Sequence, residues 1–159
     1  EESPLTDEDF KVFKGLDFYP INEKFIVEAK FTRTPNEKVF KMKTTGTRLP
    51  EYVKYGELAF NIDGKAFKLN FYQNIDLTKK EGYEDYLFLP FSDLTCGKES
   101  YIGGRYIDMR ISKTDLVTID FNKAYNPYCA YNHKYSCPIV PLENDLDIEI
   151  LAGVKKFHD

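Results

Sequence analysis

The sequence predicts a mostly β protein, a single antiparallel barrel or sandwich of about eight strands with one short N-terminal helix. Apolar and polar residues alternate with a period of two along much of the chain, as they do in half-buried strands. Turn-forming residues separate these segments, and Asp63-Gly64 is the strongest hairpin signal among them. The aromatic residues are 12 Tyr and 13 Phe with no Trp, a set that favours strands. A length of 159 residues corresponds to one domain over residues 1–159.

Residues 1–20 are expected to form a helical segment that covers part of the strand domain. Thr6 has the side chain of a helix N-cap, and the three residues after it are acidic, as in a first helical turn. Phe10, Phe13 and Leu16 then follow one apolar stripe, and Gly15 is a stop signal. The pattern therefore predicts one short amphipathic helix.

The strands are expected wherever the two-residue alternation runs between turn residues. Asp63-Gly64 should join two of them as a hairpin. The predicted strands are residues 24–31, 38–44, 56–62, 65–72, 86–91, 105–111, 115–121 and 147–151.

The segments 105–111 and 115–121 are predicted to pair as a second hairpin, because a short loop would bring their apolar faces together. Arg105 then lies at the end of an apolar row, where a guanidinium needs a carboxylate or a ligand as partner. Asp108 and Asp120 would come near each other on the polar face.

Composition and motifs exclude several classes of protein. The net charge of −4 and the pI near 5.3 disfavour a nucleic-acid binder. No apolar run reaches the ~18 residues of a membrane-spanning helix. The segment Thr95–Glu99 departs from a phosphate-binding loop because Glu99 stands where Ser or Thr must hold magnesium. The glycine-rich dinucleotide, zinc-protease and nucleophile-elbow motifs do not occur.

The long connection over residues 122–146 is the candidate site. Connections longer than ~12–15 residues in a small domain are usually functional or packed as compact loops. This one is rich in Tyr and Asn, which pair an aromatic or planar body with a polar tip and so suit the walls of a binding pocket.

The same region carries a resemblance to a family. Asp120-Phe121-Asn122-Lys123-Ala124-Tyr125-Asn126-Pro127, Cys129-Ala130-Tyr131 and Cys137-Pro138 closely resemble the signature of the bacterial and archaeal domain-of-unknown-function family 1684. Further similar positions run from Tyr55-Gly56 through Phe91, Asp93, Thr95, Gly97, Glu99 and Tyr101 to Gly104-Arg105-Tyr106, Glu143-Asn144 and Ala152-Gly153. Cys96 and Val154 depart from the family pattern. The resemblance implies no established activity.

The chain begins at Glu1 without an initiator Met, which fits either a removed signal peptide or a boundary of the sequence. Members of the family often carry an export or lipoprotein signal, so the resemblance implies a periplasmic or cell-surface protein rather than a cytoplasmic one.

Three readings of Cys129, His133 and Cys137 stay open. The regular spacing would suit zinc only on a helix, which this sequence does not favour. Cys129 and Cys137 could instead form a disulfide or pack as thiols, a bridge that an exported protein would allow. The third reading is a reactive Cys and His pair. With Cys96 the chain has an odd number of cysteines.

The favoured function is the binding of a small polar or aromatic molecule at the mouth of a β barrel. A loop that only seals the barrel ranks second, and an enzyme with a Cys129 or Cys137 nucleophile and a His133 base ranks third. Nothing in the sequence identifies a cofactor or an oligomeric state. The expected ligand-binding residues are Glu99, Arg105, Asp120, Asn122, Tyr125, Asn126, Tyr131 and Asn144.

Overall fold

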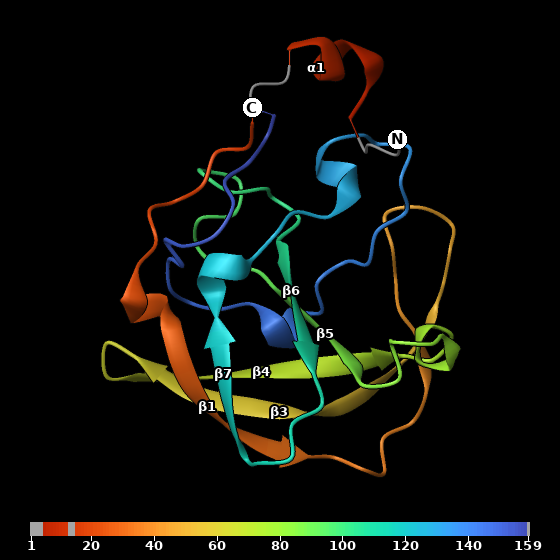
Figure 1. The fold of residues 1–159 in the computed structure, drawn as a ribbon, viewed down its shortest axis with the longest axis vertical. Coiled ribbons are helices and arrows are strands. Elements are labelled where there is room, and N and C mark those ends of the chain that lie inside the picture. The colour runs from red at the N-terminus through yellow and green to blue at the C-terminus, as the bar shows by residue number, and fades with distance from the viewer. Residues whose placement is uncertain (1–4, 13–14, 159) are drawn as a thin grey trace.

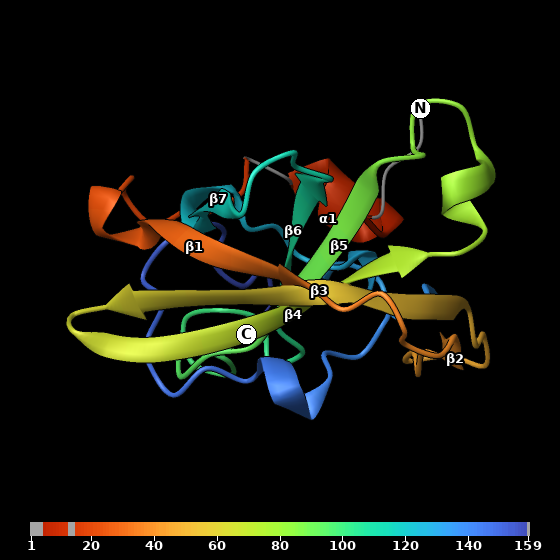
Figure 2. The same cartoon turned by 90° about the horizontal axis from the view of Figure 1, so that it is seen from below.

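The computed structural model describes residues 5–12 and 15–158, and in them seven antiparallel strands form one curled sheet (Figure 1). The sheet order is β6-β5-β4-β3-β1-β7, with β2 paired to β3. The strands are β1 (Ile26–Arg33), β2 (Phe40–Lys41), β3 (Glu51–Ile62), β4 (Lys65–Asn74), β5 (Tyr86–Phe91), β6 (Arg105–Arg110) and β7 (Leu116–Asp120). Both ends of the sheet, β5–β6 and β1–β7, lie on the same side of the β3–β4 hairpin, which makes the sheet a half-barrel (Figure 2).

The predicted β3–β4 hairpin is confirmed and is the longest pairing in the sheet. Asp63 and Gly64 have φ angles of 54° and 77°, as a two-residue turn with the twist of its strands requires. The register runs from Ile62 opposite Lys65 to Tyr52 opposite Asn74, with a bulge near Gly56. A Cβ atom at Gly56 would lie 2.6 Å from the carbonyl oxygen of Thr32 in β1, so the bulge needs glycine.

The main core fills the inside of the half-barrel. Alternate residues of β5 and β6 point into it together with those of β1, β3, β4 and β7, as period-two strands dictate. Segments after β7 contribute Leu146, Ile150 and Ala152 and close the open side. The largest fully buried apolar side chains include Phe25, Phe71, Phe91 and Phe121.

The predicted hairpin of residues 105–111 and 115–121 is wrong. β6 pairs with β5 along its whole length, from Phe91 opposite Arg105 to Tyr86 opposite Arg110, and β7 pairs with β1. The outer edge of β6 is bridged at Tyr106 by Tyr125 instead. The apolar faces of β6 and β7 meet across the curled core, so matching faces do not require hydrogen-bonded neighbours. Asp108 and Asp120 line one cleft between these strands.

Two more sequence predictions need correction. Residues 147–151 form no strand. At Ile150, the N–H donates to Asp93 and the carbonyl accepts from Arg105, so buried side chains take the place of a neighbouring strand. The strand predicted over residues 38–44 shrinks to β2. The predicted fold class, a mostly β antiparallel domain with a short helix, is confirmed, and its seven strands form a half-barrel.

The predicted N-terminal helix is confirmed as α1 (Asp7–Val12). Thr6 Oγ1 accepts a hydrogen bond from the Asp9 N–H at 3.2 Å, as an N-cap does. Of the predicted apolar stripe, the side chain of Phe10 and the whole of Phe13 fall outside what the structure describes. Leu16 is exposed. Asp9 Oδ2 lies 3.1 Å from His158 Nε2, which places α1 against the C-terminal segment. None of the described helices has the length and apolar character needed to cross a membrane.

The remaining short elements are single 3-10 turns that shape the connections. They are η1 (Glu23–Phe25), η2 (Leu77–Lys79), η3 (Phe121–Lys123), η4 (Tyr128–Ala130) and η5 (Leu142–Asn144). η4 and η5 lie within the predicted long loop over residues 122–146, and η3 lies at its start, so this loop is a succession of tight turns packed on the sheet.

Candidate ligand-binding site

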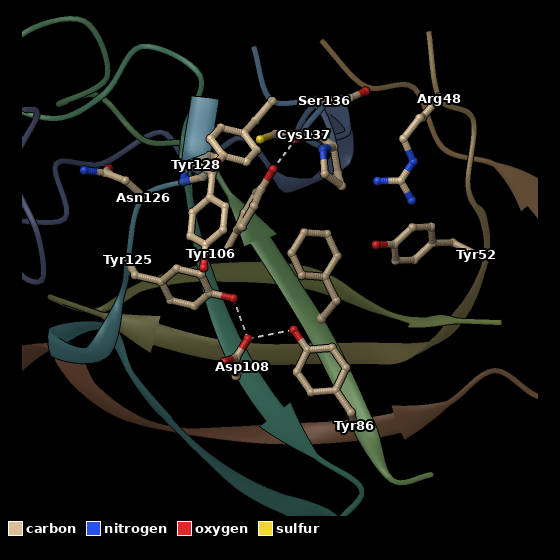
Figure 3. A pocket seen from close by; sticks show the side chains of 14 residues that line it. Arg48, Tyr52, Tyr86, Tyr106, Asp108, Tyr125, Asn126, Tyr128, Ser136 and Cys137 are labelled. Carbon is tan, nitrogen blue, oxygen red and sulfur yellow. Dashed lines mark hydrogen bonds between the residues drawn. The ribbon is translucent and has the colours of Figure 1, made fainter. Parts of the chain in front are cut away.

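A cavity of about 740 Å³ lies between the long loop and the face of β5 and β6 that points away from the main core (Figure 3). We call it the tyrosine cavity, because six of its lining residues are tyrosines. The lining residues are Arg48, Tyr52, Tyr86, Phe88, Tyr106, Asp108, Tyr125, Asn126, Pro127, Tyr128, Tyr135, Ser136, Cys137 and Pro138.

The floor of the tyrosine cavity is a second apolar cluster, separate from the main core. Phe88 and Tyr106 occupy neighbouring strands, and their rings meet edge to face with centroids 4.6 Å apart. Tyr52 packs on Phe88 from β3. Edge-to-face packing fixes the ring planes, so the floor is a rigid aromatic surface.

Asp108 stands at one end of the tyrosine cavity and accepts two phenolic hydrogen bonds. The hydroxyls of Tyr86 and Tyr125 donate to its Oδ1 at 2.6 and 2.5 Å, as Figure 3 shows. Burial, together with the nearby carboxylate, raises the pKa of both tyrosines well above the ordinary range. Both hydroxyls therefore remain protonated donors, and Asp108 supplies an anchored negative charge.

Arg48 stands at the other end, beside Tyr52 (Figure 3). Asp108 and Arg48 are the charged side chains among the described residues that line the cavity. The Tyr52 hydroxyl accepts a hydrogen bond from Asn74 at 3.2 Å. Burial raises the pKa of Tyr52, while the positive charge of Arg48 opposes that rise. The cavity is therefore an aromatic trough with opposite charges at its ends.

The roof of the cavity is the loop from Tyr125 to Pro138, which is anchored at both sides. Tyr125 and Tyr106 exchange both of their backbone hydrogen bonds, at 2.9 Å each. At the other end, the Thr45 N–H donates to the Cys137 carbonyl at 2.9 Å, and Thr44 and Ser136 join their hydroxyls at 2.7 Å. The loop is held in place on the sheet, so the cavity is preformed.

Of the predicted ligand-binding residues, Tyr125 and Asn126 line the tyrosine cavity. Asn126 is buried, but its amide points away from the cavity in Figure 3. Its Nδ2 donates to the carbonyl of Lys155 and to the hydroxyl of Tyr131, both at 3.2 Å. Tyr131 itself is buried against Phe157. Asn126 and Tyr131 therefore hold the loop to the C-terminal segment.

Arg105 lies in the core and does not line the cavity. Its side chain is fully buried, and it donates to the backbone carbonyls of Ile150, Ala152 and Val154. Its Nη2 lies 3.6 Å from a carboxylate oxygen of Asp93, which is equally buried. Asp93 and the carbonyls of residues 150–154 are thus the partners that the sequence predicts for this guanidinium. Through them, Arg105 holds the C-terminal segment against the half-barrel.

Asn144 is also fully buried and connects β4 to β5. Its Oδ1 accepts from the Asn70 N–H at 2.9 Å, and its Nδ2 donates to the carbonyls of Asn70 and Pro90 at 2.7 Å each. These strands pair at one described position, Tyr72 opposite Phe88, and Pro90 has no N–H to offer. The amide of Asn144 therefore replaces ladder hydrogen bonds.

Glu99, Asp120 and Asn122 make local contacts outside the tyrosine cavity. Asp120 caps η3 by accepting from the Asn122 backbone N–H at 3.0 Å. Asn122 exchanges two hydrogen bonds with the backbone of Asn22, which ties η3 to the N-terminal segment. Glu99 is exposed and accepts from the Tyr19 hydroxyl at 3.1 Å.

Cys129, His133 and Cys137 do not converge on one point. Cys129 and His133 line a second cavity of about 320 Å³, whereas Cys137 lines the tyrosine cavity. Both cysteines are free thiols. No cluster of three metal-ligating side chains occurs within residues 5–12 and 15–158.

The tyrosine cavity contains residues that the sequence reasoning missed, namely Arg48, Tyr52, Tyr86 and Phe88. The sequence places Asp108 on a polar strand face but gives that face no partner that would make it a site. The missing information was the pairing of residues 86–91 with residues 105–110, which sets Phe88 opposite Asp108. Tyr86 and Phe88 are two residues apart and therefore share one face of their strand. With the pairing known, this face would have been recognised as part of the site.

Comparisons with known proteins agree with the sequence resemblance. An uncharacterised protein of Haloarcula marismortui, solved by solution NMR, has the same fold with a TM-score of 0.77 and 32% sequence identity. The alignment covers 97% of this chain and 83% of that one. No curated protein matches. The profile of the family described as protein of unknown function (DUF1684) matches residues 11–155, and the chain belongs to this family.

Proposed function

We propose that the protein binds a small polar molecule with a ring or an otherwise flat body in the tyrosine cavity. The observation that carries the proposal is the combination of a preformed cavity of about 740 Å³ with six tyrosines and two opposite charges. Small-molecule sites commonly have volumes of roughly 300–1,000 Å³, mostly apolar walls and a few polar groups that orient the ligand.

The two charged ends favour a ligand with a cationic group. Asp108 is fixed by two tyrosine hydroxyls that both act on Oδ1. Its position beside aromatic rings suits an ammonium group, which carboxylates and ring faces both attract. Arg48 at the other end suits a hydroxyl or a carboxylate on the same molecule.

Chemical-shift changes in NMR spectra of the ¹⁵N-labelled protein test the proposal. The probes are tyramine, 4-hydroxyphenylacetate and glucose, which represent a cationic ring, an anionic ring and a neutral polyol. We expect tyramine to shift the amides of residues 105–110 and 125–138 in a saturable manner. Asp108→Asn should weaken tyramine binding about two- to fivefold, since Asp108 is exposed and an exposed ion pair contributes about 0.5–1 kcal/mol.

Asp85→Asn is the matched control, because Asp85 pairs with Arg110 at the end of the neighbouring strand without lining the cavity. It should leave tyramine binding unchanged. Failure of all three probes to shift these amides, or equal loss in both variants, would contradict the proposal and favour a loop that only covers the sheet.

A further inference from the structure

The second cavity, which we call the cysteine cavity, shares no lining residue with the tyrosine cavity. It lies between the turn after Thr95, η4 and the C-terminal segment. Cys129 forms part of its wall and is buried. The lining residues are Gly97, Ser100, Tyr101, Ile102, Cys129, Ala130, His133, Lys156 and His158.

Cys129 has a second thiol as its direct neighbour. Its backbone N–H donates to the sulfur of Cys137 at 3.2 Å, because η4 and the turns after it return the chain to the same place. The Cys137 N–H donates in turn to Thr45 Oγ1 at 3.1 Å. Two neighbouring thiols, Cys129 in the wall of this cavity and Cys137 in the wall of the tyrosine cavity, are the arrangement that a dithiol needs for exchange with a disulfide.

The surroundings of the two thiols differentiate them. The Cys137 thiol lies next to Cys129, and the Tyr101 hydroxyl lies 3.5 Å from the Cys129 sulfur. Both contacts stabilise a thiolate and lower the pKa of Cys129 to about 6 against the opposing effect of burial. The neighbouring Cys129 side chain and burial raise the pKa of Cys137, so this thiol keeps its proton.

The cysteine cavity favours anions. Its charged and titratable lining groups besides the thiol and Tyr101 are Lys156, His133 and His158, and no carboxylate lines it among the described residues. Two acidic residues contact its lining: Asp9 Oδ2 lies 3.1 Å from His158 Nε2, and the backbone carbonyl of Glu99 accepts from the Lys156 N–H at 2.9 Å. An anionic reagent that reaches Cys129 therefore meets basic side chains.

We propose that Cys129 and Cys137 form a redox-active dithiol that exchanges with a small anionic disulfide, of the class of glutathione disulfide, at the cysteine cavity. The cavity admits the reacting end of such a molecule. The Cys129 thiolate attacks one sulfur, the disulfide bond of the reagent breaks, and one half leaves as a thiolate that takes up a proton. Cys137 then loses its proton and attacks the Cys129 sulfur, which releases the second half as a thiol. The protein loses two hydrogens and the reagent gains two.

The test uses Cys96→Ser protein, so that two thiols remain, and follows intact mass after addition of glutathione disulfide. Without a further change, we expect loss of two hydrogens and no bound glutathione. With Cys137→Ser, we expect one glutathione trapped on Cys129. With Cys129→Ser, the reaction at pH 6 should be at least about tenfold slower than with Cys137→Ser. At pH 6, about half of a thiol with a pKa near 6 is ionised, against about 0.3% of an ordinary thiol. A thiolate of lower pKa is also less nucleophilic, which reduces this advantage in rate by roughly a factor of ten to fifteen.

Charge and folding are controlled separately. Lys156→Gln should slow the reaction with glutathione disulfide and leave the reaction with uncharged hydroxyethyl disulfide unchanged. If either cysteine variant fails to fold, peptide mapping of the partly reacted Cys96→Ser protein identifies the first cysteine to carry glutathione. Equal rates for the two cysteine variants, glutathione first on Cys137, or equal slowing of both reagents by Lys156→Gln would overturn the proposal.

Discussion

Replacement of Asn144 by Ala should destabilise the fold strongly, because it removes three hydrogen bonds at once. The N–H and the carbonyl of Asn70 and the carbonyl of Pro90 lose their contacts with the Asn144 amide. A buried polar group left without a partner costs about 1–3 kcal/mol. Water that enters the space left by the amide can replace part of this loss, so we expect a loss of about 3–6 kcal/mol in the free energy of unfolding. Typical domains have about 5–15 kcal/mol in total.

Urea denaturation followed by circular dichroism measures this loss. Asn132→Ala is the matched control, because its side chain accepts one bond from Lys134 near the surface. It should cost about 1 kcal/mol or less. If Asn144→Ala cost no more than Asn132→Ala, the argument that this amide replaces ladder bonds between β4 and β5 would be refuted.

Asn144→Asp should make the stability of the fold depend on pH. The new carboxylate keeps the shape of the amide but faces two carbonyl oxygens, so its pKa in the folded state must lie above the unfolded value of about 3.9. The charged form is therefore disfavoured by folding, and the cost is greatest above the folded pKa. As the pH falls through that pKa, a protonated side chain regains one donor, and the variant should recover stability relative to the wild type. A constant difference between pH 7 and pH 4 would contradict this.

Three further outcomes are expected. In urea denaturation, Gly104→Ala should cost well over 1 kcal/mol and Gly82→Ala about 1 kcal/mol. Both glycines have φ near +90°, so Ala is strained at either position. A Cβ atom on Gly104 would also lie 2.6 Å from a backbone oxygen, whereas nothing lies within 4 Å of a Cβ atom on Gly82. Arg105→Leu should lower the free energy of unfolding by about 3–5 kcal/mol, because it leaves a buried carboxylate unpaired. Arg110→Leu, at an exposed ion pair, should lower it by less than about 1 kcal/mol. Equal losses would show that burial of the pair is irrelevant. Asp108→Asn should lower the pKa values of the two tyrosines that donate to it, so ultraviolet absorbance at alkaline pH should show tyrosinate earlier than in the wild type; an unchanged titration would mean that burial alone raises them.

The sequence was informative where structure is local. Asp63-Gly64 predicted a turn because few residue pairs adopt its positive φ angles, and Thr6 predicted a helix start because its hydroxyl replaces a missing backbone acceptor. The same reasoning went wrong for residues 105–121. Two strands joined by a short loop usually pair with each other, but here β6 pairs with β5 and β7 pairs with β1. The alternation of apolar residues is the same in both arrangements, so it does not distinguish them.

The candidate site was predictable in part for the same reason. The long loop could be recognised from its Tyr and Asn content, and Tyr125 does line the cavity. Arg105 and Asn144 were expected to bind ligand because a buried guanidinium or amide needs partners, and sequence patterns do not distinguish a ligand from backbone carbonyls. The structure supplies those partners from residues 45–49 positions away from Arg105 and 54–74 positions away from Asn144.

The contacts of Arg105 also bear on when this protein can fold during its synthesis. The carbonyls that it binds belong to residues translated 45–49 positions later. At about 5–20 residues per second, the guanidinium waits roughly 2–10 s for them on the ribosome. The β3–β4 hairpin can form in that interval, because its partners are adjacent in the chain. The half-barrel can close fully only after residue 154 has left the exit tunnel, so the open side of the sheet stays uncovered until then.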